Sequence, residues 1–213
     1  MSRTVTALEK KGNGVVAVTV IADDEGGDGS PPALLPIESV ILNQVREGAE
    51  FPDVRWEEIR ADGALLLATR RGLELLSRKP RTERDLRKAL VEDFQPIDID
   101  RALARLHELG YLDDRAWSDR YVGSPRAQVR GRSLLRSELK ARGVSDEVVA
   151  ETLEGRDELA AAIETAAKRI RSLRTIEDEE RRKRRLYDFL RRRGFADDVC
   201  RRAMESVLAA AEG

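Results

Sequence analysis

The spacing of apolar residues divides the chain into a short β-rich start and a long helical remainder. Runs 4–10 and 14–21 are rich in β-branched residues, and the turn-like residues 11–13 between them favour a β-hairpin. A third short strand is expected at 34–37. From about residue 62 onward, apolar residues recur at spacings of three and four, which predicts a series of amphipathic helices.

Two short helices are expected between the strands and the helical region. Ser39 is predicted to cap the first, which would continue to about Arg46. Asp53 is predicted to cap the second, with Trp56 and Ile59 on its buried side. The acidic, Gly- and Pro-rich stretch before them is expected to be a flexible loop over residues 23–32.

A near-repeat organises the helical part. LKARGVSDEVV at 139–149 and LRRRGFADDVC at 190–200 share Leu, Arg, Gly, an acidic residue and Val in one register, and a weaker copy starts at Leu90. A fixed period of this size indicates one structural unit stacked along the chain. Gly143 and Gly194 follow predicted helix ends, where a left-handed backbone favours glycine.

The fold predicted from these patterns is mainly α. Three tandem three-helix repeats would form an elongated, curved body, preceded by a small β-hairpin and short helices. The predicted limits are 1–61 for the N-terminal segment, 62–112 for repeat 1, 113–155 for repeat 2 and 156–213 for repeat 3.

Composition supports small helical modules. Aromatic residues make up only 4% of the 213 residues while charged residues make up 37%, which suits thin helical cores. No apolar run approaches the roughly 18 residues of a membrane span, and the start lacks a secretory apolar region, so a cytoplasmic protein is expected. The net charge of −1 argues against general polyanion binding, and any nucleic-acid contact would need local cation clusters.

Catalytic and metal-binding chemistry finds little support. His107 is the only histidine and Cys200 the only cysteine; the first is interpreted as a surface or packing residue and the second as a buried thiol. No phosphate-binding loop of the GxxxxGK[ST] type is present. The acidic pairs at 113–114 and 197–198 precede predicted helices, where helix capping explains them better than metal binding. Neither an enzyme nor a cofactor is expected.

Several short motifs follow one another in order along the helical part of the chain. They are LLSRKPRTE at 75–83 with Leu86 and Leu90, GYLDD at 110–114 before Trp117, Gly131 with ELK at 138–140 and RGV at 142–144, and RRGF at 192–195. Together they resemble the RecX family, regulators of the RecA recombinase. The resemblance covers roughly residues 64–209, and the N-terminal segment matches an extension of some members more loosely. The acidic loop departs from the family pattern, and Trp117 stands where Phe is usual.

The resemblance implies a non-catalytic regulator that binds the groove of the RecA–DNA filament. It would modulate, and is expected to inhibit, RecA ATPase activity and strand exchange in DNA repair and recombination. The protein would contact DNA either directly or within the filament. A monomer is the simplest expectation for its oligomeric state. No membrane partner is implied.

Cations concentrate around the middle helices of the second and third repeats. The functional interpretation is a pair of electropositive surfaces that face DNA phosphates or acidic grooves of a protein filament. The alternative is a solvated helix face paired with the acidic residues at 177–180. The candidates are Arg126, Arg130, Arg132, Arg136, Lys140 and Arg142 in the second repeat, and Arg181, Arg182, Lys183, Arg184, Arg185, Arg191, Arg192 and Arg193 in the third.

Two other functions stay open at this point. Three-helix units resemble helix-turn-helix geometry, so the chain could bind DNA without RecA, with a steep salt dependence and sequence preference. Alternatively it could be a helical adaptor with no nucleic-acid role, which would bind its partner tightly and with little dependence on salt.

Overall fold

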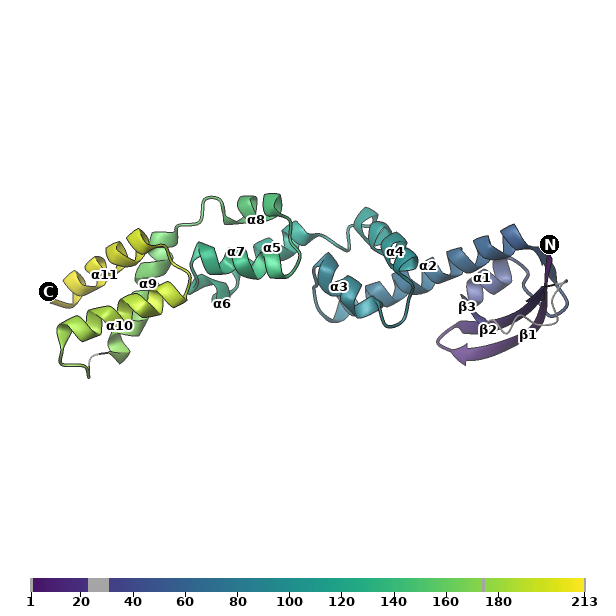
Figure 1. Cartoon of the computed structure of the whole chain (residues 1–213), viewed down its shortest axis with the longest axis horizontal. Coiled ribbons are helices and arrows are strands. Elements are labelled where there is room, and N and C mark those ends of the chain that lie inside the picture. Colours follow the sequence, from purple (N-terminus) through teal and green to yellow (C-terminus); the bar gives the residue numbers. More distant parts are fainter. Residues whose placement is uncertain (1, 23–30, 174, 213) are drawn as a thin grey trace. The chain divides into compact units, whose positions relative to one another are not determined.

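The structure is a computed structural model that describes residues 2–22, 31–173 and 175–212. It contains two compact units, Met1–Leu112 and Asp113–Gly213. Figure 1 labels most of their helices and strands. The flexible loop predicted at 23–32 lies outside the described residues except for Pro31 and Pro32.

The first unit begins with an antiparallel sheet of four strands in the order β3-β2-β1-β4. The sheet contains the predicted hairpin and third strand, and a fourth strand that the sequence pattern does not indicate. The strands are β1 (Ser2–Gly12), β2 (Val15–Ala22), β3 (Ala33–Pro36) and β4 (Glu50–Pro52). β4 has only three residues and pairs with the start of β1, so it has no alternation of its own to recognise.

The hairpin turn lies one residue later than the predicted 11–13. Asn13 and Gly14 form the turn with φ angles of 49° and 72°. Positive φ at both central residues is the geometry that matches the twist of a two-residue hairpin, and Asn and Gly adopt it most readily. Gly12 belongs to β1, next to a register irregularity after Lys10.

The first short helix differs from its prediction. α1 (Ile37–Leu42) is capped by Pro36, and Ser39 lies inside the helix, where its carbonyl accepts a 2.9 Å hydrogen bond from Asn43 Nδ2. The helix ends at Leu42 rather than near Arg46. Gln44 has a φ of 53°, so the chain leaves the helical conformation there and cannot continue α1.

A single helix replaces the two helices expected on either side of residues 61 and 62. α2 (Asp53–Arg78) is 26 residues long and continuous. Its first half packs Trp56 and Ile59 against the sheet, and its second half contributes Leu75 to the core of the first repeat. Because tertiary contacts support both halves, the helix passes through the change in surroundings without interruption. Asp53 is its first residue rather than its cap, and its carboxylate accepts a 3.1 Å hydrogen bond from Arg3.

Repeat 1 consists of the end of α2 with α3 (Glu83–Leu90) and α4 (Pro96–Glu108). Thr82 caps α3 by accepting a hydrogen bond from the Asp85 amide at 3.2 Å. Leu86, Leu90 and Leu106 are fully buried between these helices. Gly110, with a φ of 72°, ends the repeat two residues before the division between the two units.

The second unit contains two further three-helix arrangements, and the first of them holds one additional helix of four residues, Pro125–Gln128. Asp113 caps its first helix through a 2.9 Å bond from the Ala116 amide, which confirms the capping interpretation there. Asp197 is instead the first residue of the last helix and accepts a hydrogen bond from Tyr187. The helices are α5 (Asp114–Gly123), α6 (Pro125–Gln128), α7 (Arg132–Ala141), α8 (Asp146–Leu153), α9 (Glu158–Ser172), α10 (Glu179–Arg192) and α11 (Asp197–Glu212).

The near-repeat marks equivalent positions in the two arrangements. Leu139 and Leu190 are both fully buried, and Val149 and Cys200 are nearly or fully buried. Gly143 and Gly194 have φ angles of 85° and 82°, which confirms the predicted helix termination. The chain is therefore mainly helical, and its three-helix units follow a small β segment in the sequence. The limits assigned to each repeat stay predictions.

Candidate functional site

Four arginines on one side of α10 are exposed. Arg181, Arg184, Arg185 and Arg192 follow one another at intervals of three, one and seven residues, which places them on one face of a helix. Leu186 and Leu190 face the core on the opposite side. Within the described residues, the four guanidinium groups make no hydrogen bond or ion pair. We call this set the α10 stripe.

Neighbouring cations on α10 are engaged locally. Lys183 Nζ lies 2.6 Å from Glu179 and 3.3 Å from Glu180, and hydrogen bonding to these carboxylates raises the pKa of Lys183. Arg182 donates to the Ile176 carbonyl at 3.4 Å. The alternative of a solvated, paired helix face therefore describes Lys183, but not the α10 stripe.

In the second repeat, two of the predicted cations are exposed and unpaired within the described part of the chain. They are Arg126 on α6 and Arg136 on α7. Lys140 forms a 2.5 Å ion pair with Asp146, and both side chains are largely exposed, so water can replace either partner at little cost.

Arg130 has a structural role. Its side chain is only 10% exposed, forms an ion pair with Glu138 and donates to the Tyr121 hydroxyl at 3.1 Å. Burial, followed by the hydrogen bond to Glu138, raises the pKa of Tyr121. Because these groups satisfy one another inside the unit, Arg130 is not presented to a partner.

Arg132 and Arg156 connect the second and third repeats. Arg132 donates to the Arg156 carbonyl at 2.7 Å, and its amide donates to Glu158 at 2.9 Å. Arg156 in turn donates to the carbonyls of Ala127 and Arg130, each at 3.1 Å. Burial lowers the pKa of Arg156. These arginines hold the two repeats together by satisfying carbonyls near the end of α6.

A backbone contact, which we call the repeat seam, lies beside them. The Gly131 amide donates to the Arg193 carbonyl at 2.8 Å, and the Ser133 amide donates to the Gly194 carbonyl at 3.2 Å. The free amides at the start of α7 thus meet the free carbonyls at the end of α10. A Cβ on Gly131 would lie 2.2 Å from the Gly194 oxygen, so the seam requires glycine at this position.

Two of the remaining cations pack against aromatic rings. Arg142 lies over the stacked rings of Trp117 and Tyr121, 5.3 and 5.8 Å from their centroids. Arg193, at the equivalent position in the third repeat, lies 5.1 Å from the centroid of Phe189. Arg191 instead donates a hydrogen bond to the Phe195 carbonyl at 2.9 Å.

Two cations of the site were missed by sequence reasoning. Lys168 and Arg169 lie on α9, outside the Arg-rich middle helices, yet they line a groove with Phe189 and Arg193 of the α10 end. Their spacing from Thr165 and Ser172 follows the helical period, but only the packing of α9 on α10 shows that they meet Arg193.

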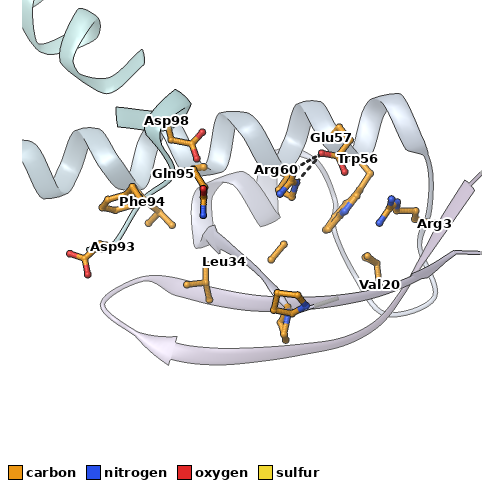
Figure 2. Close-up of a pocket in the computed structure, with 15 residues that line it drawn as sticks. Arg3, Val20, Leu34, Trp56, Glu57, Arg60, Asp93, Phe94, Gln95 and Asp98 are labelled. Atoms are coloured by element: carbon orange, nitrogen blue, oxygen red, sulfur yellow. Dashed lines mark hydrogen bonds and ion pairs between the residues drawn. The ribbon is translucent and has the colours of Figure 1, made fainter. Parts of the chain in front are cut away.

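A larger cavity of about 520 Å³ lies in the first unit, between the sheet, α2 and the start of α4 (Figure 2). Arg3 and Arg60 are its lining cations. Arg3 is paired with Asp53 at 3.1 Å and Arg60 with Glu57 at 2.6 Å. Phe94 and Leu34 make part of the rim apolar.

The residues considered for metal or catalytic chemistry have ordinary surroundings. His107 is exposed, and its Nε2 lies 3.0 Å from Glu83. Across residues 2–22, 31–173 and 175–212, no three His, Cys, Asp or Glu side chains gather in a metal-binding arrangement. Over the same residues, no helix has the length and apolar character needed to cross a bilayer.

Cys200 is expected to react slowly with thiol reagents in the folded protein. It is fully buried, and burial raises the pKa of its thiol from 9.0 to about 11. The folded chain therefore keeps its proton between these pH values while the unfolded chain loses it, so this group costs stability as the pH rises from 9 towards 11. Labelling at about pH 8 with a chromogenic disulfide, where an ordinary thiol is partly ionised, should be far slower in buffer than in urea. Equal rates would contradict the burial.

Comparisons with known proteins converge on one family. Residues 156–204 match the sequence profile described as RecX, third three-helix domain. A regulatory protein RecX of Chlorobium phaeobacteroides is 33% identical over 115 residues, covering 54% of this chain and 75% of that protein. One of Thermus thermophilus is 39% identical over 142 residues, covering 66% and 92%. A crystal structure of regulatory protein RecX aligns with a TM-score of 0.66 at 23% identity, covering 92% of this chain and 96% of that one, and supports the same fold.

Proposed function

Because this chain belongs to the RecX family, we propose that it regulates the RecA recombinase by binding the RecA–DNA filament and lowering its ATPase and strand-exchange activity. The proposed role is non-catalytic and cytoplasmic, and the protein acts as a monomer. The relatives' shared name of regulatory protein supports a regulatory role, and the RecA filament is the partner that the resemblance implies.

The α10 stripe is the observation that supports a filament surface most directly. Four guanidinium groups on one helix face remain available to a partner, although the whole chain carries a net charge of −1. A filament that contains DNA presents closely spaced phosphates, and cations that approach them release condensed counterions. Arg126 and Arg136 extend the same chemistry to the second repeat.

Changing all four residues of the α10 stripe to glutamine is expected to weaken filament binding by about tenfold or more and to flatten its salt dependence. Thermal stability should change little, because exposed charges contribute little to folding. The measurement is RecA ATP hydrolysis on single-stranded DNA, titrated with each protein at several salt concentrations.

A matched control removes four other exposed cations. Arg55, Arg60, Arg78 and Arg105 each pair with an acidic residue three or four positions away, and all lie in the first unit. Their replacement by glutamine changes the net charge equally and should leave regulation nearly unchanged. If both variants lose regulation equally, the α10 stripe is not the binding surface. If the unchanged protein has no effect on RecA, the proposed function is wrong.

A further inference from the structure

A cationic groove lies between α9 and α10, which pack side by side in the second unit (Figure 1). It has a volume of about 330 Å³, and its polar lining consists of basic and hydroxyl side chains. Among the described residues, no carboxylate lines it. The lining residues are Val129, Thr165, Lys168, Arg169, Ser172, Phe189 and Arg193. We call it the α9–α10 groove.

Helical spacing brings the donors of α9 to one side. Thr165, Lys168, Arg169 and Ser172 are separated by three, one and three residues, so they lie along one face of the helix. Arg169 Nη1 donates to Ser172 Oγ at 3.1 Å, which holds the guanidinium along this face. Lys168 also forms a 2.6 Å ion pair with Glu164, but both side chains are more than 60% exposed, so this pairing competes weakly with a bound anion.

The Phe189 ring contacts the guanidinium groups of both Arg169 and Arg193. The guanidinium carbons of Arg169 and Arg193 each lie 5.1 Å from the centroid of the Phe189 ring. Contact with one ring limits the separation of the two guanidinium carbons to about 10 Å at most, and an anion between them would offset the repulsion of the like charges. The two helices therefore hold a pair of guanidinium groups ready for a negatively charged ligand.

Two buried polar atoms in this groove lack partners. Thr165 is only 4% exposed, and its Oγ1 has no hydrogen-bond partner among the described residues. Arg169 Nε is also buried and has no hydrogen-bond partner among the described residues. Buried donors are normally satisfied, and unpaired ones call for an explanation such as an absent ligand.

We propose that the α9–α10 groove binds a phosphate of the nucleic-acid backbone, with Arg169 and Arg193 as guanidinium donors, Lys168 at the rim and Thr165 as a hydroxyl donor. Guanidinium groups suit phosphate because they offer parallel N–H donors to two oxygens. Along the chain, Arg193 of the groove directly follows Arg192 of the α10 stripe. Binding here requires no RecA, so this inference stands apart from the proposed regulation.

Binding of the full chain to a fluorescent oligothymidine, measured by anisotropy without RecA, tests the proposal. The double change Lys168→Gln and Arg169→Gln should weaken binding about tenfold and lower the slope of log affinity against log salt by about 0.7, the contribution of one phosphate contact on a single strand. Thr165→Val removes only the hydroxyl and should weaken binding with little effect on thermal stability.

The control is the double change Arg201→Gln and Arg202→Gln on α11, which alters the net charge equally outside the groove. Equal losses in both double variants would show general charge attraction and overturn the proposal. The proposal is also overturned if the unchanged chain does not bind oligothymidine. This holds even if the chain binds polyglutamate or inorganic phosphate instead. RecA ATP hydrolysis measured with the same variants separates failure of the groove from failure of the proposed regulation.

Discussion

Truncation of Leu190 to alanine is expected to lower the free energy of unfolding by about 2–5 kcal/mol, as is typical of large-to-small changes in a packed core. Leu190 is fully buried and belongs to a cluster with Leu186, Phe195 and Cys200. The deleted isopropyl group would leave a void among side chains that come from α9, α10 and α11. Thermal and urea unfolding followed by circular dichroism would measure the effect.

The control for this truncation is Leu42→Ala. Leu42 is 83% exposed at the end of α1, so the same chemical deletion removes little buried surface there. Its effect should stay within about 0.5 kcal/mol. A small effect of Leu190→Ala would contradict the assignment of the near-repeat leucines to the core.

Replacement of Gly131 by alanine is expected to open the repeat seam and destabilise the second unit by about 1–3 kcal/mol or more. The added Cβ would lie 2.2 Å from the Gly194 oxygen and 2.3 Å from the Phe195 amide nitrogen. These are backbone atoms and cannot rotate away as a side chain would. The seam must therefore separate, which weakens the two hydrogen bonds that join α7 to the end of α10.

The control for the seam is Gly123→Ala. Gly131 has a φ of −77°, which alanine adopts without strain, so its close neighbours are the only obstacle. A Cβ on Gly123 would meet nothing within 4 Å. Alanine there should be neutral or stabilise by up to about 1 kcal/mol. Urea unfolding and amide exchange at Ser133 would show the contrast, and similar behaviour of both variants would refute the seam.

Local patterns were enough to predict most of the helical fold. Helical periodicity and the near-repeat placed Leu139 and Leu190 in the core and assigned Gly143 and Gly194 to helix ends. They were less reliable near the N-terminus. The two helices expected on either side of residues 61 and 62 form one helix, because α2 is supported by the sheet at one end and by repeat 1 at the other. Neither contact is visible in a short stretch of sequence.

In the candidate site, too, the sequence predicted some residues correctly and could not predict others. The residues of the α10 stripe were found from composition and spacing, but Arg130 was grouped with them although it is buried against Glu138. Sequence could not distinguish the two cases, because an arginine that pairs within its unit and one that faces solvent differ only in which helices pack nearby. Lys168 and Arg169 were missed for the converse reason, since their neighbours in the groove come from another helix.

The sequence alone determined the family resemblance, the predominance of helices and the helix ends at Gly143 and Gly194, because these depend on residues within a few turns of one another. Tertiary structure decided which cations are available and which are occupied inside the unit. It also created the repeat seam and the α9–α10 groove, since both require atoms from segments far apart in the chain to come within a few ångströms. Distances of that kind follow from packing, which no local pattern encodes.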